Sequence, residues 1–183
     1  MKYGDPYAGK RKHPVVIITA DVRTGKIIGM ESHVEGTGPS EPETASMHVR
    51  EAVMKGVRGK EFYGDGAFDL NDLFDLMHSI GAKPVIKIRK NSSPGRYRRR
   101  AIREYREKGY RSWAAENNYG MRWPGTEGIF SAVKRKFGEN CVSRSTEGLE
   151  AEGCQRFWVY DYINQGAKRE VRMTTLTPQI IRE

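Results

Sequence analysis

The spacing of apolar and polar residues along the chain predicts where its strands and helices lie. Residues 13–20 and 26–34 are rich in β-branched residues and flank the turn sequence DVRTG, so they predict a β-hairpin. Ser40 and Glu43 then have the spacing of a capping box. This pattern predicts a helix that begins there and ends at Gly56.

The middle of the chain has the order strand, helix, strand. Residues 60–64 and 83–88 are short apolar runs, and the helical spacing over residues 70–80 between them ends at Gly81. Asp69 is a plausible N-cap for this helix. Two strands joined by a helix predict a parallel pair with a right-handed crossover. Together with the hairpin, the pair predicts an α/β fold built on a mixed sheet.

Three further helices are predicted in the second half of the chain. The first covers residues 98–108 and is very basic, and the second has Glu127 in its first turn, with apolar residues at helical spacing on another face. The third covers roughly residues 147–164. Its predicted apolar stripe consists of Cys154, Phe157, Trp158 and Tyr162.

Length and composition indicate one domain with two short flanks. We expect an irregular lead-in over residues 1–12, a single domain over 13–165 and a charged tail over 166–183. Cys141 and Cys154 are thirteen residues apart, without the close pairing of a zinc site, and predict thiols in a reducing compartment. Nothing resembles a signal peptide or a membrane span, so we expect a cytoplasmic protein with no membrane partner.

The positive charge of the chain is concentrated in one segment. The formal net charge is +9, yet between Lys83 and Arg111 twelve Lys and Arg stand against two Glu, a local +10. The remainder of the chain therefore sums to −1, since 9 − 10 = −1. Tyrosines and tryptophans interleave with these basic residues. The pattern suits contact with a nucleic acid, although a solvated basic linker has the same composition.

Two acids are candidate metal ligands. Asp65 follows the strand at residues 60–64, and ligands gather at the carboxyl ends of strands in α/β sheets. Because Asp69 fits the capping role, Asp65 is left for another role. Glu127 shares a helix face with Lys134, seven residues later. Mg²⁺ and Mn²⁺ prefer carboxylate oxygens, and two such ions can assist phosphodiester cleavage. The alternatives are a turn residue for Asp65 and an ordinary first-turn acid for Glu127.

Several features follow one another along the chain: the motif YGDGAFD, the helix and basic run after it, and then Tyr119, Arg122, Glu127 and Lys134. This ordered series resembles the DDE transposases of bacterial and archaeal insertion sequences. The resemblance covers about residues 12–164. It implies a ribonuclease-H-like fold and a site of two Asp and one Glu that binds two Mg²⁺ or Mn²⁺ ions. It also implies cleavage and strand transfer of DNA at the ends of the element.

The resemblance assigns roles to individual residues. Asp65 matches the second acid and Glu127 the third, so both are expected to be catalytic and to bind metal. The expected partners are transposon-end and target DNA, in a homo-oligomeric, nucleoid-associated complex. The Tyr-Arg-Glu-Lys signature and the basic run together predict DNA contacts by Tyr119, Arg122, Lys134, Arg96, Arg98, Arg99, Arg100 and Arg103.

The chain departs from the family pattern at two places. Four residues separate Arg122 from Glu127 where the signature has three, and a Pro and a Gly among them predict that Arg122 lies off the helix of Glu127. The family's first Asp lies on a strand before the hairpin. Only Asp5, in the lead-in, and Asp21, in the hairpin turn, precede Gly25 here, and neither has that position. We hypothesise that the chain is a C-terminal piece of a transposase without the central strand.

Three functions therefore stay open at the level of sequence. The first is a metal-dependent DNA strand transferase. The second is a non-catalytic DNA-binding remnant that keeps the fold and the basic surface. The third is a structure-specific nuclease that uses the same acids.

Overall fold

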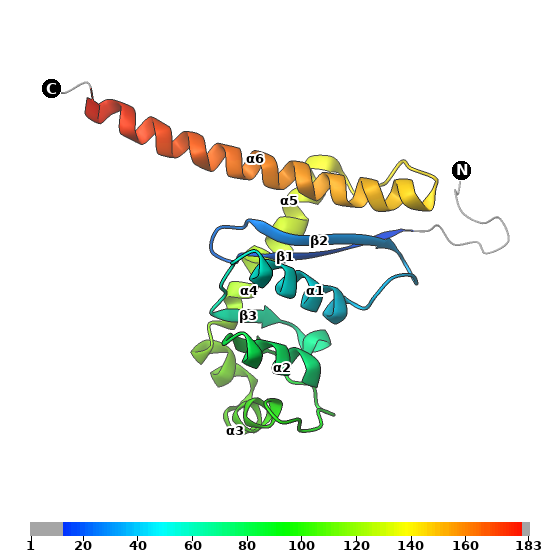
Figure 1. The fold of residues 1–183 in the computed structure, drawn as a ribbon, viewed down its shortest axis with the longest axis vertical. Helices are drawn as coiled ribbons and strands as arrows, with labels where there is room; N and C mark the ends of the chain where they lie inside the picture. The colour runs from blue at the N-terminus through cyan, green and yellow to red at the C-terminus, as the bar shows by residue number, and fades with distance from the viewer. Residues whose placement is uncertain (1–12, 181–183) are drawn as a thin grey trace. The chain divides into compact units, whose positions relative to one another are not determined.

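The computed structural model describes the backbone of residues 13–180 and the side chains of residues 13–166. The lead-in expected over residues 1–12 lies outside the described residues, as do residues 181–183. The strands of the described chain lie in its first half, and the second half is helical, as Figure 1 shows. The elements are β1 (Pro14–Ala20), β2 (Ile27–Val34), α1 (Glu41–Met54), β3 (Glu61–Gly64), η1 (Gly66–Phe68), α2 (Asn71–Ser79), β4 (Lys83–Ile86), α3 (Arg98–Glu116), η2 (Tyr119–Met121), α4 (Arg122–Gly125), α5 (Glu127–Phe137) and α6 (Thr146–Ile180).

The predicted elements of the first half are confirmed, and the chain has the α/β class that the sequence indicates. The Glu43 carboxylate accepts a hydrogen bond from the Ser40 backbone N–H at 2.8 Å, as a capping box requires. Gly56 and Gly81 end α1 and α2 with φ of 81° and 70°, a conformation that favours glycine. Asp21 lies in the hairpin turn, where its carboxylate accepts the Arg23 backbone N–H at 2.8 Å.

The strands form two separate sheets in the described part of the chain, instead of the one mixed sheet predicted. β1 pairs with β2, and β3 pairs with β4. The second pair is parallel, as predicted, with Glu61 opposite Lys83 and Gly64 opposite Ile86. The prediction of a single sheet fails because no strand in residues 13–180 is hydrogen-bonded to both pairs.

The chain divides into two compact units, and the division passes through β1, β2 and α5. The larger unit contains residues 17–31 and 38–129. The smaller unit contains the described residues 13–16, 32–37 and 130–180. Each unit has its own buried residues and is described by itself.

The larger unit is organised by the alternation of side chains along β4. Ile86 lies in an apolar cluster with residues of α2, including Leu73 and Phe74. Val85, the preceding residue, is fully buried in a second cluster with Trp113 and Tyr119. Successive side chains of a strand point to opposite faces, so β4 is covered on both sides. Both-sided burial is typical of parallel strands.

The basic helix α3 is interrupted at Gly109. This glycine has φ 70° and ψ 163°, which separates the predicted helix from a second stretch that ends at Glu116. A residue with a side chain rarely adopts such a positive φ. Lys108 forms ion pairs with Glu104, at 3.0 Å, and with Glu116, and so links the two stretches.

The smaller unit is built where α6 lies against the end of the hairpin. The Val34 backbone N–H donates to Glu150 Oε1 at 3.2 Å, and Phe130 packs edge-on against Phe157 with ring centroids 4.9 Å apart. A side chain on the buried Gly153 would collide with Ser32 Oγ. The close approach of α6 therefore depends on the absence of a Cβ at this position.

The apolar stripe predicted for the last helix is wrong in two residues. Phe157 is buried, but Trp158 and Tyr162 are 60% and 71% exposed and stack on each other. The reason is helical geometry: neighbouring residues point about 100° apart, and the buried line is Leu149, Gly153 and Phe157, spaced by four. α6 also continues to Ile180 instead of ending near residue 164, since the residues after the predicted end include strong helix formers.

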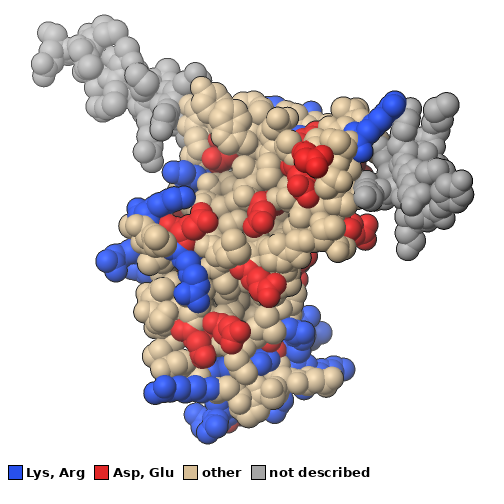
Figure 2. Space-filling model, turned by 45° about the vertical axis from the view of Figure 1, so that its right-hand side comes forward, with Lys and Arg blue, Asp and Glu red and all other residues tan. Residues whose placement is uncertain are grey.

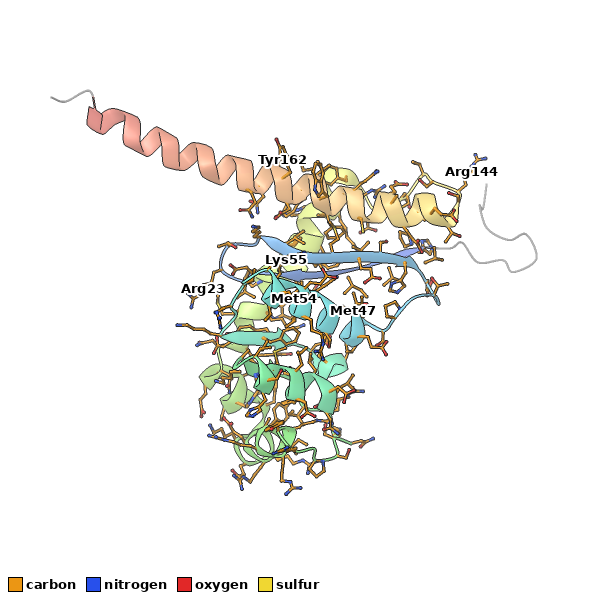
Figure 3. The ribbon with its side chains drawn as sticks, viewed as in Figure 1. Arg23, Met47, Met54, Lys55, Arg144 and Tyr162 are labelled. Carbon is orange, nitrogen blue, oxygen red and sulfur yellow. The ribbon has the colours of Figure 1, made fainter. Side chains whose placement is uncertain are left out.

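Some apolar side chains of α1 are exposed. Met47 and Met54 of α1 are labelled in Figure 3, and they are 48% and 87% exposed. The opposite side of α1 is buried, and His48 there lies 3.1 Å from Thr19 Oγ1 of β1 through its Nδ1. No helix over residues 13–180 combines the length and apolar character needed to cross a membrane.

Glu152 fixes the loop before α6. Its carboxylate accepts the backbone N–H groups of Val142 and Ser143, each at 3.0 Å, and pairs with Arg156. Burial by itself would raise the pKa of Glu152, but these donors outweigh burial and lower the pKa from 4.5 to about 2. The carboxylate thus stabilises the folded state in its charged form.

We predict that Glu152→Gln lowers the free energy of unfolding by about 1–2 kcal/mol at pH 7, because hydrogen bonds to a charged acceptor become bonds to a neutral one. Since the folded pKa is depressed, the wild-type advantage should be fully present above about pH 4.5 and should disappear as the pH falls towards about 2. Urea unfolding at several pH values measures this difference. Glu139→Gln, which alters an exposed ion pair with Lys134, is the control and should change stability far less.

Candidate nucleic-acid interface and carboxylate site

Asp65 lies directly after β3, as the sequence predicts. Its Oδ1 accepts the Ala67 backbone N–H at 2.7 Å, so Asp65 caps the short turn η1. The residue is half-buried. One carboxylate oxygen is therefore engaged by the backbone, and the group keeps lone pairs that could bind a cation.

The local role of Asp69 differs from the prediction. Asp69 does not cap α2, whose N-cap is Leu70. Instead, the Asp69 side chain is buried, with a residue exposure of only 1%. The prediction fails because the chain makes the extra turn η1 between β3 and α2, so Asp69 lies inward of the start of α2, and Asp65 caps η1.

The buried Asp69 carboxylate joins three segments of the chain. Oδ1 accepts from Arg98 Nε at 2.7 Å, at the start of α3, and Oδ2 accepts from the Arg89 backbone N–H at 2.8 Å. Ser92 Oγ donates to Oδ2 as well. Burial alone would raise the pKa of Asp69, but the donors, Arg98 foremost, lower it. Asp69 is therefore charged inside the larger unit, where it holds these three segments together.

Arg89 holds the other side of the same loop. Its guanidinium donates to the carbonyl oxygen of Ala67 at 3.2 Å and lies 3.4 Å from that of Asp69. The loop from Asp65 to Asp69 is thus bonded at Ala67 and at Asp69 to the segment that follows β4. No sequence pattern predicts a role for Arg89 and Ser92, and the only signal for them is their position shortly after a buried strand.

Tyr119 and Arg122 lie beside the strand end that carries Asp65. The Tyr119 hydroxyl donates to the Gly64 carbonyl oxygen at 3.0 Å. Arg122 is stacked between two aromatic rings, 5.2 Å from the ring centre of Tyr119 and 4.7 Å from that of Trp123. Burial raises the pKa of Tyr119, Arg122 opposes the rise, and Asp65 adds to it. The structure therefore brings Asp65, Tyr119 and Arg122 together.

Glu127 is the first residue of α5 and is exposed, as predicted. Arg122 lies on the separate helix α4, which confirms the prediction that it is off the helix of Glu127. Lys134 also lies on α5, but it belongs to the smaller unit and pairs with Glu139 at 3.3 Å. Within residues 13–166 no group of three or more His, Cys, Asp and Glu side chains has the arrangement of a metal site.

Exposed arginines cover α3. Figure 2 shows Lys and Arg side chains gathered at the lower end of the view, where Figure 1 places α3. Arg99, Arg100 and Arg103 are exposed, and within the described side chains none of the three forms an ion pair with a carboxylate. Arg100 and Arg103 also line a surface hollow of about 270 Å³, together with Glu104, Glu107 and Lys108. We call Arg99, Arg100 and Arg103 the arginine surface.

Two residues expected to contact DNA lie inside the larger unit. Arg98 is only 6% exposed and is bound to Asp69, so it is not part of the arginine surface. Tyr119 is only 4% exposed, and its hydroxyl is bonded to Gly64. Arg96 is exposed and lies over the Tyr97 ring, with 5.2 Å from its guanidinium carbon to the ring centre.

Comparisons of the chain with protein-family models, with curated protein sequences and with solved structures gave no match.

We predict that Tyr119→Phe lowers the free energy of unfolding by about 1 kcal/mol, because the Gly64 carbonyl oxygen loses a buried hydrogen bond. Thermal or urea unfolding measures the loss. Tyr110→Phe is the control, since Tyr110 is 49% exposed and water can replace its hydrogen bonds. Equal effects of the two substitutions would show that the Tyr119 hydroxyl does not stabilise this strand end.

Proposed function

We propose that the chain binds DNA through the arginine surface of α3, as part of a protein of the DDE transposase class. The observation that supports this proposal is the exposure of three neighbouring arginines that have no ion-pair partner among the described side chains. Arginine binds phosphate oxygens in a bidentate manner, and phosphate contacts supply most of the sequence-independent affinity of DNA-binding proteins. A helix whose first turn is anchored at a buried ion pair presents such arginines in a defined direction.

The ribonuclease-H-like fold is part of this proposal. A hairpin, a helix and then a parallel strand–helix–strand unit follow one another in the order that the resemblance implies. The same resemblance implies a central strand next to the hairpin, and in residues 13–180 the hairpin and the parallel pair are separate sheets. From the resemblance alone, we also propose a DNA-bound homo-oligomer as the active form, in which copies of the chain share the DNA.

Metal-dependent cleavage of DNA is a second candidate function, favoured by one observation. Asp65 lies at the carboxyl end of β3 next to Tyr119 and Arg122, where a carboxylate and a cation could both reach a phosphodiester. Asp65 and Glu127 carry the hard oxygen donors that Mg²⁺ and Mn²⁺ prefer, and they are the residues that would hold the metal. Bound there, the ion would polarise the phosphate and activate the attacking oxygen.

We predict that replacing Arg99, Arg100 and Arg103 together with Gln weakens binding to duplex DNA. The slope of log affinity against log salt should become shallower by up to about 2.7, because each phosphate contact contributes about 0.9 for B-DNA. Fluorescence anisotropy over a salt series measures both quantities. The control replaces the exposed Lys55, Arg58 and Lys60 with Gln, which removes the same charge elsewhere in the larger unit. Equal losses in the two triple variants would show that net charge, rather than this surface, causes binding.

We predict that any Mg²⁺- or Mn²⁺-dependent nicking of supercoiled plasmid falls to background in Asp65→Asn. Asparagine keeps the oxygen that caps η1, so the loop should stay folded while the charge is lost. Asp75→Asn, an exposed site on α2, makes the same chemical change and should leave nicking intact. DNA binding by the wild type without any nicking would support the non-catalytic alternative.

A further inference from the structure

The arrangement around Asp69 links the two parts of the proposed site. On one side, the Asp69 carboxylate accepts a hydrogen bond from the Arg89 backbone N–H. The Arg89 side chain in turn donates to the carbonyl oxygen of Ala67, in the loop from Asp65 to Asp69. The other side is tied to Arg98 at the start of α3. The arginine surface begins at the next residue, Arg99. A single buried group thus touches both the carboxylate loop and the helix that carries the arginines.

We propose that Asp69 is a positioning residue, which holds the Asp65 loop and the first turn of α3 in one arrangement and thereby presents the arginine surface as a preformed set. This inference rests on the proposed DNA binding. The inference goes beyond DNA binding because it assigns the orientation of the arginines to Asp69, a buried residue of the opposite charge. Preformed side chains bind more tightly because less conformational entropy is lost on binding.

The sign of the charge makes this inference testable. Asp69→Asn removes one negative charge from a protein that binds a polyanion, so an electrostatic effect alone would strengthen binding to DNA. Loss of positioning would weaken binding instead. Asp75→Asn is the matched control, because it makes the same chemical and charge change at an exposed site on α2.

The experiment measures the affinity of each variant for a short labelled duplex, at a temperature at which circular dichroism shows the variant to be folded. We expect Asp75→Asn to bind as tightly as the wild type or more tightly, and Asp69→Asn to bind at least about threefold more weakly. Equal or tighter binding by folded Asp69→Asn would overturn the inference.

A second measurement separates positioning from a loss of stability. In the wild type, Arg100→Gln should weaken binding, and in the Asp69→Asn background the same substitution should weaken it less, because the arginine is no longer held in place. Additive effects of the two substitutions would contradict positioning. If Asp69→Asn does not fold, Ser92→Ala takes its place, since it removes one hydrogen bond to Asp69 without changing the charge.

Hydrogen exchange of the protein without DNA distinguishes failure of this inference from failure of the proposed function. In Asp69→Asn the amides of residues 65–68 and of residues 99–103 should exchange faster together, whereas Asp75→Asn should leave both segments unchanged. Faster exchange in only one segment would show that Asp69 does not couple them. If the wild type does not bind DNA, the proposed function fails, and the exchange result still decides whether Asp69 couples the loop to α3.

Discussion

The larger unit depends on the requirement that the buried Asp69 carboxylate be paired. A charge removed from water costs several kcal/mol unless donors surround it, and leaving one such partner alone typically costs about 3–5 kcal/mol. The donors of Asp69 come from Arg89 and Ser92 in the segment that follows β4 and from Arg98 of α3. The apolar cluster around α2 also includes Ile102 of α3, and the bond between Asp69 and Arg98 fixes the start of that helix. The pKa of Asp69 is lowered overall, so this contribution is complete above the ordinary Asp range and is lost as the pH falls through the folded pKa.

Pairing inside the protein also decides how much of the positive charge can reach a ligand. The segment from Lys83 to Arg111 carries a formal +10, but its basic residues have different roles. Arg98 and Arg89 bond to the Asp69 loop, and Lys108 is held by two glutamates. The charge open to a phosphate is therefore smaller than the formal sum. A salt slope that corresponds to a few contacts fits this surface better than one that corresponds to ten.

Local signals in the sequence were reliable, and long-range ones were not. The capping box at Ser40, the glycine ends of α1 and α2 and the parallel β3–α2–β4 unit depend on neighbouring residues or on a short crossover, and all are confirmed. The position of Asp65 depends on the three-residue turn η1, and the burial of Asp69 depends on Arg98, which is 29 residues away. No local sequence pattern encodes either feature. For the same reason Arg98 was expected at the surface. Hydrophobicity alone predicts Trp158 and Tyr162 inside, but the angle between successive helical residues turns both away from the buried side of α6.

The four residues between Arg122 and Glu127 include a break between two helices. Within a continuous helix, one added residue would turn every preceding side chain by about 100° relative to Glu127. Here α4 ends before Thr126, whose φ of −124° and ψ of −79° separate it from α5. The direction of Arg122 is set by its two aromatic neighbours and not by the register of α5. The extra residue therefore leaves Arg122 beside the strand end that carries Asp65, because Tyr119, which is bonded to Gly64, fixes that position.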